Sequence, residues 1–477
     1  FISASNFYQN AGDARTGCDA VYKVINNGRN PIYGRWWPAI DLATDDVVSK
    51  DRRTNFNAWF NHTINAEHAW LEAWGQYQGF WIGISRANDV IDNVPNIEMD
   101  EAEKNAIIGE ARALRALSFF NLVQQYGGVN IDLEEPLSIR NDYTRSSEEE
   151  TYTLIITELE AAISGLLNDP ETGRFSKRAA QHVLAEVYLT RAYKPFAAAN
   201  DFQTAADLAV QAIGSYDIRS QTFAEVFDYD NQVNPEILFA AQWGETVNTA
   251  DRNNNKHSLF MTGVQELPGV SRSNPYGKSG NGLMPTPYFY SLFDADDTRD
   301  DVTIHRAIIA DEAGFAIGTD NIAVGDTLVY FPKVALDVTE LTDKLDRYWV
   351  YQPDEYLYGR PADVAGVNYL YTLNPLFTNF PIMKKFDDEV FQEEGGGARD
   401  TFIFRVAETH LIAAEAFLGA NNTADATLLL AAPVTEKITA VKVEDEEAFW
   451  VITSKDGRFN VFKVDQYLPR LYALDTN

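Results

Sequence analysis

The chain has 477 residues, of which 45% are hydrophobic and 23% charged, an ordinary composition for a folded protein with a large core. Its formal net charge is −31, and so acidic a surface repels nucleic acid and anionic lipid headgroups at long range. The same negative field disfavours the binding of sulfated or uronic-acid polymers, unless a local basic patch overrides it. The single cysteine, Cys18, excludes an intramolecular disulfide framework, and we expect its side chain to be buried.

Helical periodicity dominates the first half of the chain. Apolar residues recur at spacings of three, four or seven, and they predict helices over 59–92, about 100–126, 148–167, 176–193, 201–214 and, much later, 401–420. Small residues stand where two helices of a pair would touch, as in tetratricopeptide hairpins. They are Ala179, Ala180, Ala185, Ala205, Ala206, Ala413, Ala414 and Ala416. The spacing between pairs is irregular, so we expect a mainly α, interrupted helix-pair scaffold.

The predicted helix that contains "GEARALRALSFFNLVQQYGGV" (109–129) has no clean polar side. Asp100 and Glu103 suggest a capping box at its start, and Gly127 with Gly128 suggests its end. An inner helix of a stack contacts neighbours on two sides, so we expect this helix to lie inside the scaffold. Its two central arginines, Arg112 and Arg115, are then expected to pair with acids between stacked helices, and the candidate acids are Glu186 and Glu408.

The amino-acid composition changes between about residues 220 and 400, where Gly, Pro, Asn and Asp are frequent. Short runs such as "DTLVYF" (326–331) predict isolated strands, and long loops in a compact protein are usually functional. We therefore expect a single domain over 1–425, with a helical scaffold at 1–219 and 400–425 and a loop-rich, ligand-binding region at 220–399. The tail, 426–477, alternates apolar and polar residues around a Lys455-Asp456-Gly457 turn, which predicts a β-hairpin.

Catalytic motifs are lacking. The six histidines show no zinc-binding spacing, and no Gly-x-Ser-x-Gly nucleophile motif occurs. We expect His182 and His410, which lie inside apolar helices, to be core residues. The acidic run "DADDTRDD" (294–301) lacks the glycine and final glutamate of an EF-hand loop, so we expect a solvated turn, with a structural calcium ion as the weaker alternative. A catalytic pair of carboxylates for glycoside hydrolysis is not excluded, because the sequence gives no distances between its acidic side chains.

Five segments of the sequence resemble segments of one protein family and stand in the same order along the chain. "EARALRALSFFNLVQQYGGV" (110–129) resembles the signature of the SusD/RagB family of Bacteroidetes nutrient-binding lipoproteins. The other four are "YGRWWPAIDLATDDVV" (33–48), "ISRANDVIDNV" (84–94), "LMPTPYFYSLFDADDTRD" (283–300) and "KKFDD…RDTFIFRVAETHLIAAEAFLGANN" (384–422). After residue 425 the chain departs from the family's pattern, which would finish with helices.

The resemblance implies a function without catalysis. A SusD-like protein would capture oligosaccharides and deliver them to a TonB-dependent outer-membrane transporter of the SusC type. It would be exposed on the outer membrane and held there by an N-terminal lipid anchor, which we expect to be absent from this chain. No cofactor is implied. Two alternatives are the capture of oligopeptides, as in RagB-like members, and a protein-binding tetratricopeptide scaffold; a hydrolase would instead turn its ligand over.

Sugar recognition needs flat aromatic platforms together with side chains that bond to hydroxyl groups. In the family, the segment after the Asp-rich turn supplies part of the ligand site, which here implies Asp46, Arg52, Arg53, Asn57 and Trp59. The loop-rich region adds further aromatic candidates. They are Trp243, Tyr276, Trp349, Tyr351 and Tyr358.

Overall fold

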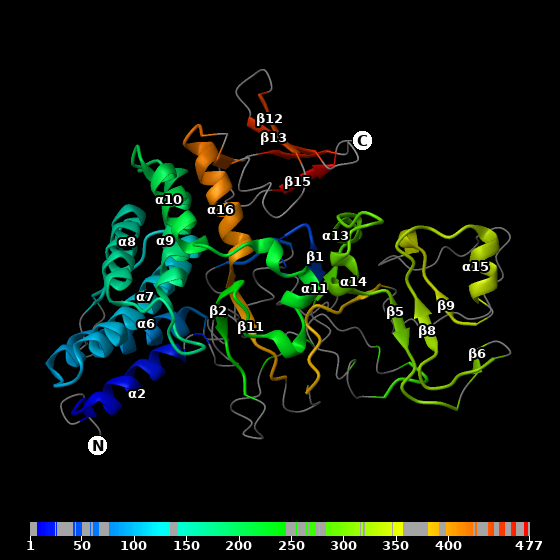
Figure 1. Cartoon of the computed structure of the whole chain (residues 1–477), viewed down its shortest axis with the longest axis horizontal. Coiled ribbons are helices and arrows are strands. Elements are labelled where there is room, and N and C mark those ends of the chain that lie inside the picture. Colours follow the sequence, from blue (N-terminus) through cyan, green and yellow to red (C-terminus); the bar gives the residue numbers. More distant parts are fainter. Residues whose placement is uncertain are drawn as a thin grey trace.

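The structure is a computed structural model. It describes residues 7–23, 44–49, 61–65, 76–133, 142–244, 267–271, 283–314, 316–317, 320–345, 347–355, 380–390, 397–422, 425–426, 437–442, 448–453, 459–463 and 472–475, with the single positions 25, 42, 58, 254, 257, 264 and 276. Within the described residues, seven helices form a scaffold along one side of the molecule (Figure 1). They are α2 (Ala11–Tyr22), α6 (Gln76–Asn93), α7 (Glu101–Tyr126), α8 (Glu148–Gly165), α9 (Lys177–Ala192), α10 (Asp201–Ile213) and α16 (Val406–Gly419).

Each scaffold helix packs on the next in chain order, from α2 to α10, and α16 returns from far along the sequence to pack against α10. This is the order of contacts in a stack of helix pairs. All eight alanines predicted at the contacts are fully buried. The mainly α helix-pair scaffold is therefore confirmed, and the predicted helices 148–167, 176–193 and 201–214 are observed with ends shifted by at most two residues.

Helix α7 lies inside this stack, as predicted. Both of its apolar sides are buried, one through Ile107 and Leu114 and the other through Phe119 and Phe120. The Asp100 side chain accepts a hydrogen bond from the backbone N–H of Glu103, and the helix ends at Gly127, whose φ of 69° suits glycine. An inner position explains why the sequence shows no polar side.

The two arginines of α7 pair with an acid, as predicted, but the acid is Glu158 of α8 rather than Glu186 or Glu408. Arg112 Nη1 lies 2.6 Å from Glu158 Oε1, and Arg115 Nη2 lies 2.5 Å from Oε2. The sequence-based prediction chose the wrong helices because periodicity gives the face of a helix and not its neighbour. Since α8 follows α7 directly in the stack, its own buried acid is the one within reach.

A two-stranded ribbon joins the scaffold to the loop-rich region. Strand β2 (Ile237–Ala241) pairs antiparallel with β11 (Thr401–Arg405), which leads directly into α16. The prediction of a helix from residue 401 is thus wrong for its first five residues. In "TFIFR" the aromatic Phe404 packs into the core beside Phe239 and Phe175, so tertiary packing favours a strand there.

The loop-rich region has a hydrophobic core of its own, separate from the core of the scaffold. The predicted strand at 326–331 is observed as β8 (Thr327–Tyr330), although it pairs with β5 (Ala307–Ile309) and β9 (Trp349–Val350) instead of standing alone. The other short elements here are β1 (Val47–Ser49), β3 (Leu283–Pro285), β4 (Ile304–His305), β6 (Ala316–Ile317), β7 (Asp320–Asn321), β10 (Ile382–Met383), α11 (Phe223–Val226), α13 (Pro287–Ser291), α14 (Arg299–Thr303) and α15 (Val338–Leu345). Single 3-10 turns occur at Val94–Asn96, Ile218–Ser220, Tyr229–Asn231 and Pro353–Glu355.

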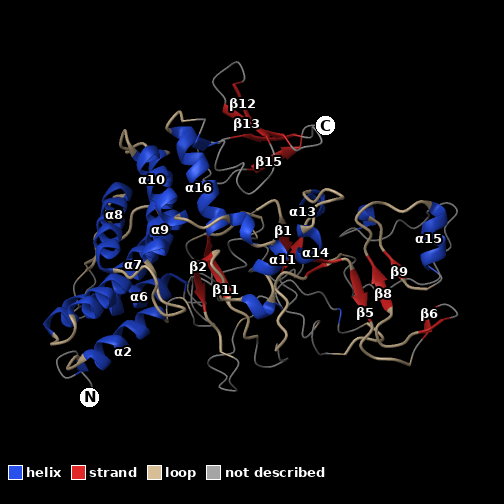
Figure 2. Ribbon diagram, viewed as in Figure 1, coloured by secondary structure: helices blue, strands red, loops and turns tan. Residues whose placement is uncertain are grey.

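The end of the chain is β structure, as its alternating pattern predicts. Strands β12 (Lys437–Lys442), β13 (Ala448–Thr453), β14 (Phe459–Lys463) and β15 (Tyr472–Asp475) form one antiparallel sheet, each paired with its neighbour in sequence. Figure 2 shows this sheet apart from the strands of the loop-rich region. The predicted Lys455-Asp456-Gly457 turn lies outside the described residues. No helix within the described ranges combines the length and apolar composition that crossing a bilayer requires.

Candidate ligand-binding surfaces

The Asp-rich turn at residues 44–46 lies against the segment 283–286, although almost 240 residues separate them in sequence. Strands β1 and β3 pair there, with Val47 opposite Pro285. The backbone N–H of Thr286 donates to the Asp46 carbonyl at 2.8 Å, and the Thr286 hydroxyl donates to the Asp45 carbonyl at 2.7 Å. The fold thus brings together two of the five blocks on which the family resemblance rests.

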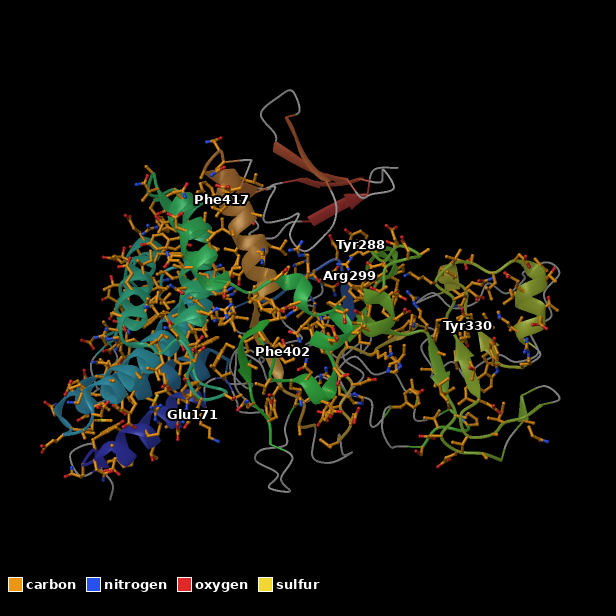
Figure 3. The ribbon with its side chains drawn as sticks, in the orientation of Figure 1. Glu171, Tyr288, Arg299, Tyr330, Phe402 and Phe417 are labelled. Atoms are coloured by element: carbon orange, nitrogen blue, oxygen red, sulfur yellow. The ribbon has the colours of Figure 1, made fainter. Side chains whose placement is uncertain are left out.

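An exposed aromatic ring stands next to this junction. Tyr288 lies two residues after Thr286 on the short helix α13, and 38% of its surface is exposed (Figure 3). Sequence reasoning did not single it out, because "PYFYS" contains three aromatic residues and nothing in the pattern separates the buried Tyr290 from the exposed Tyr288. The junction thus contains one predicted site residue, Asp46, and one exposed aromatic residue that was not predicted, Tyr288.

Five of the ten predicted site residues lie outside the described residues. They are Arg52, Arg53, Asn57, Trp59 and Tyr358. Their roles stay predictions. The first four follow β1 within ten residues, so the chain enters their segment directly from the junction with Thr286.

The four remaining aromatic candidates are buried, which is unlike the exposed platforms that we expected. They are Trp243, Tyr276, Trp349 and Tyr351. The Trp243 indole N–H points to Thr401 Oγ1 at 3.4 Å, and the Tyr276 hydroxyl accepts from the backbone N–H of Ile309 at 2.7 Å. A ring whose faces are already packed cannot stack on a sugar, so these residues act as core in this structure. The sequence could not distinguish the two roles, because a buried strand and an aromatic binding row have the same composition.

A second surface feature is a pocket of about 120 Å³ beside β11, which we call the basic pocket. Its lining residues are Phe227, Asn254, Lys385, Phe386, Arg399, Asp400, Thr401, Phe402 and Arg405. Phe402 marks it in Figure 3, in the middle of the molecule between the scaffold and the second core. None of these side chains was predicted as a site residue, because the pocket joins residues from four separate stretches of the chain.

The side chains of the basic pocket are held firmly. Arg405 donates through Nε to Glu236 Oε1 at 3.0 Å, and its guanidinium carbon lies 4.6 Å from the centre of the Phe227 ring. Lys385 Nζ lies 4.3 Å from the centre of the same ring. The guanidinium of Arg399 donates to the backbone carbonyls of Asp387 and Phe227. These contacts fix Lys385 and Arg405 against the Phe227 ring, while the Arg399 guanidinium lies 5.8 Å from the centre of the Tyr229 ring.

Two carboxylates of the acidic run at 294–301 hold arginines. Asp297 pairs with Arg299, and Asp300, which is buried, pairs with Arg306. The described residues contain no group of three or more His, Cys, Asp or Glu side chains arranged to hold a metal ion. Among the other predicted core residues, Cys18, His182 and His410 are all buried, as expected.

Two family models match the chain. A model described as "Starch-binding associating with outer membrane" covers residues 37–189, and one described as "SusD family" covers residues 235–438. A SusD-like protein of Bacteroides ovatus is 30% identical over 260 residues, which is 51% of this chain and 47% of that protein. A SusD-like protein of Formosa agariphila is 25% identical over 319 residues, 64% of this chain and 59% of that protein. The chain thus spans about half the length of the curated relatives that it matches.

Solved structures share the fold. A laminarin-binding SusD-like protein superposes with a TM-score of 0.60 at 21% identity, over 89% of this chain and 84% of the other. A surface glycan-binding protein A from Bacteroides uniformis gives 0.62 at 18% identity, over 88% and 79%. A SusD homolog from Bacteroides thetaiotaomicron gives 0.64 at 20% identity, over 90% and 78%. At these identities the likeness establishes the architecture, in which scaffold and loop-rich region occur together.

Proposed function

The chain belongs to the SusD/RagB family, and from this premise we propose that it is a non-catalytic surface protein that captures oligosaccharides. The observation that carries the proposal is the match of two SusD-type models, in order, to both halves of the chain. Solved proteins with this fold are named for binding laminarin and surface glycans. The proposal includes attachment at the outer membrane through an N-terminal lipid anchor, and delivery of the ligand to a SusC-type TonB-dependent transporter.

The junction of β1, β3 and α13 supports this proposal. It holds Asp46, whose carbonyl accepts from the backbone N–H of Thr286, and the exposed Tyr288 follows Thr286 by two residues. In the sequence, the predicted site residues Arg52, Arg53, Asn57 and Trp59 follow β1. An aromatic ring with neighbouring carboxylate, amide and guanidinium groups can stack on the C–H face of a sugar and bond to its hydroxyls. A few such contacts give the micromolar to millimolar affinity of a protein that must release its ligand.

The test is calorimetry of the purified chain with laminari-, malto- and xylo-oligosaccharides and with mixed oligopeptides. We expect at least one glycan to bind, and Tyr288→Ala and Trp59→Ala to weaken it by roughly 5- to 30-fold, since stacking on a ring contributes about 1–2 kcal/mol. Tyr143→Ala is the matched control, because it removes another exposed tyrosine, in the loop before α8.

Three results would contradict the proposal. Binding of oligopeptides with no heat from any glycan would assign the peptide cargo of RagB-like members. No binding to either class would favour a protein-binding scaffold. Shortened sugars after incubation, separated by chromatography, would show hydrolysis in place of simple capture.

A further inference from the structure

Another pocket, of about 280 Å³, lies between the helical scaffold and strand β2, and we call it the scaffold pocket. Its walls are the end of α2, the loop 172–174 before α9, and residues 239–242 of β2 and its end. Figure 3 shows Glu171, which directly precedes that loop, well apart from Tyr288. The scaffold pocket is therefore separate from the junction of β1, β3 and α13.

The scaffold pocket opens along one edge of β2. Successive side chains of a strand point to opposite faces, yet Phe239 and Ala240 both line the pocket, as does Gln242. The cavity thus borders the edge of the strand and not one of its faces. Within the described residues β2 pairs with β11 alone, so its other edge carries backbone N–H and C=O groups that no described strand pairs.

The opposite wall approaches β2 closely because of a glycine. Gly173 has a φ of 83°, in the left-handed region that favours glycine. A Cβ atom added there would lie only 2.7 Å from Gln242 Oε1. The loop 172–174 can therefore pass against Gln242 and bound the pocket at this end, which a residue with a side chain would prevent.

A network beneath the pocket holds its arginine in place. Arg174 Nη1 lies 2.6 Å from Asp19 Oδ1 and 3.6 Å from Glu110 Oε2. The guanidinium carbon of Arg174 lies 5.2 Å from the centre of the Tyr22 ring, and the Tyr22 hydroxyl donates to Glu110 Oε2 at 2.8 Å. Arg15 pairs with the other oxygen of Glu110 at 2.8 Å. The charge of Arg174 is thus offset by carboxylates of the protein, and its position is fixed before a ligand arrives.

Three polar side chains of the lining retain hydrogen-bonding capacity. Among the described residues, the Asp19 carboxylate pairs with Arg174 alone, and 52% of its side chain is exposed. The Thr172 hydroxyl, on the opposite wall, has no hydrogen-bond partner among the same residues. A guanidinium has five N–H donors, and both ion pairs of Arg174 use Nη1. An acceptor, a donor and a hydroxyl that can be either therefore border one cavity.

This lining suits a small ligand without charge. A volume of about 280 Å³ lies at the lower end of the range for small-molecule sites, about 300 Å³ and above, which is room for one sugar ring but not for a peptide strand of several residues. Neighbouring hydroxyls of a sugar both donate and accept, as Asp19, Arg174 and Thr172 require. Lys23, the other charged residue of the lining, is exposed and has an interaction partner. The methyl group of Ala240 adds apolar surface for the C–H groups of the ring.

We propose that the scaffold pocket is a second sugar-binding site, which holds one neutral sugar unit of an oligosaccharide by its hydroxyl groups. This inference rests on the proposed glycan-binding function and deepens it by adding a site on the scaffold to the expected site near the junction. Asp19 accepts from one hydroxyl, Arg174 donates to its neighbour, and Thr172 bonds to the ring from the opposite wall. A polymer that reaches both sites binds more tightly than it binds either one.

The experiment is calorimetry of the full chain with laminaritriose, maltotriose and xylotriose. The double variant Trp59→Ala with Tyr288→Ala disables the expected site near the junction, so the binding that remains reports the scaffold pocket. We expect at least one trisaccharide to bind this double variant. In the same background, Asp19→Asn should weaken that binding at least about 5-fold, because a charge-assisted hydrogen bond is lost, and Thr172→Val should weaken it roughly 3- to 10-fold.

Asp217→Asn is the matched control. Asp217 also pairs with an arginine, Arg219, at 2.9 Å, and its side chain is 53% exposed, but it does not line the scaffold pocket. Its replacement should change affinity by less than about 2-fold. Asp19 and Thr172 are both exposed, so neither change should disturb folding, and the thermal transition of each variant checks this.

The outcomes separate the two proposals. If the wild type binds a trisaccharide and the double variant does not, the pocket assignment is wrong and the glycan-binding function stands. The same conclusion follows if neither Asp19→Asn nor Thr172→Val weakens the remaining binding, or if Asp217→Asn weakens it as much as Asp19→Asn does. If only oligopeptides bind, or if no saccharide binds the wild type, the proposed function itself fails and the pocket assignment with it.

Discussion

At the scale of single residues, His182 of the scaffold shows how burial determines the protonation state of a side chain. His182 of α9 is fully buried, its Nδ1 lies 2.8 Å from the Thr409 hydroxyl of α16, and its ring packs on Phe404. Burial lowers the pKa of His182 to about 3, and the nearest carboxylate, Glu408, is half exposed at 3.7 Å from Nε2. The residue is thus a neutral contact between two helices, which is the core role that its apolar helix predicts.

This histidine should make the protein sensitive to acid. Below its ordinary pKa of 6.5, a histidine gains a proton in the unfolded chain, whereas His182 in the folded chain does not until about pH 3. Its contribution to stability is therefore present above pH 6.5 and is lost as the pH falls, by about 2 kcal/mol at pH 5. Urea unfolding at pH 7.5 and 5.0 measures how much unfolding free energy each protein loses between the two pH values. This loss should be about 2 kcal/mol smaller in His182→Gln than in the wild type. His62→Gln, which removes an exposed histidine, should follow the wild type; equal losses in all three proteins would contradict the argument.

At the scale of elements, one glutamate holds the inner helix to its neighbour. Glu158 of α8 receives both Arg112 and Arg115 of α7, and Arg115 also donates to Asn88 of α6 at 2.7 Å. The side chains of Arg115 and Glu158 are about 95% buried. Removal of one partner from such a pair leaves an uncompensated charge in a place that water cannot reach.

We therefore expect Glu158→Gln to lower the free energy of unfolding by about 3–5 kcal/mol. The double change Arg115→Met with Glu158→Leu should restore part of it, because two apolar groups of similar volume replace the buried pair and Arg112, whose side chain is 29% exposed, can turn to water. Glu101→Gln is the control, since it breaks the pair of the exposed Glu101 with Lys104 at the start of α7 and should cost less than about 0.5 kcal/mol. Urea midpoints of the four proteins measure the differences. A double variant as unstable as Glu158→Gln would show that shape, and not charge, is limiting.

The elements also show what the sequence can predict. Helix positions followed from periodicity, because α7, α8, α9 and α10 bury the faces that their apolar spacing marks. The position of strand β11 did not follow from periodicity. Its five residues have an apolar pattern that fits either a helix or a strand, and only the contacts of Phe404 with Phe239 and Phe175 in the fold decide for the strand. Which acid pairs with a buried arginine on another helix, and which aromatic ring is exposed, depends on contacts between distant segments. The fold was therefore needed to identify Glu158 as the partner of Arg112 and Arg115, and Tyr288 as an exposed ring.

At the scale of the whole molecule, the scaffold and the loop-rich region have separate hydrophobic cores. Among the residues whose burial the structure describes, Ala426 is the last in sequence that belongs to the scaffold core. Beyond it, β12 to β15 pair in sequence order and form a sheet from their own neighbours. We propose that residues 1–425 form one SusD-like domain and that 426–477 form a separate β unit, which matches the change of pattern in the sequence.

This division predicts that a chain ending at Ala426 folds and binds like the full chain. Its scaffold keeps α16, which covers the apolar face of α10, and the ribbon of β2 and β11 stays paired. We expect a cooperative thermal transition within about 3 °C of the full chain, since every described residue of the two cores is kept. We also expect an unchanged affinity for whichever glycan the panel identifies. A chain ending at Asp400 is the contrasting control: it loses β11 and α16, exposes the apolar face of α10 to water, and should show no cooperative transition. If the chain ending at Ala426 behaves like this control, the tail is part of the scaffold and the proposed boundary is wrong.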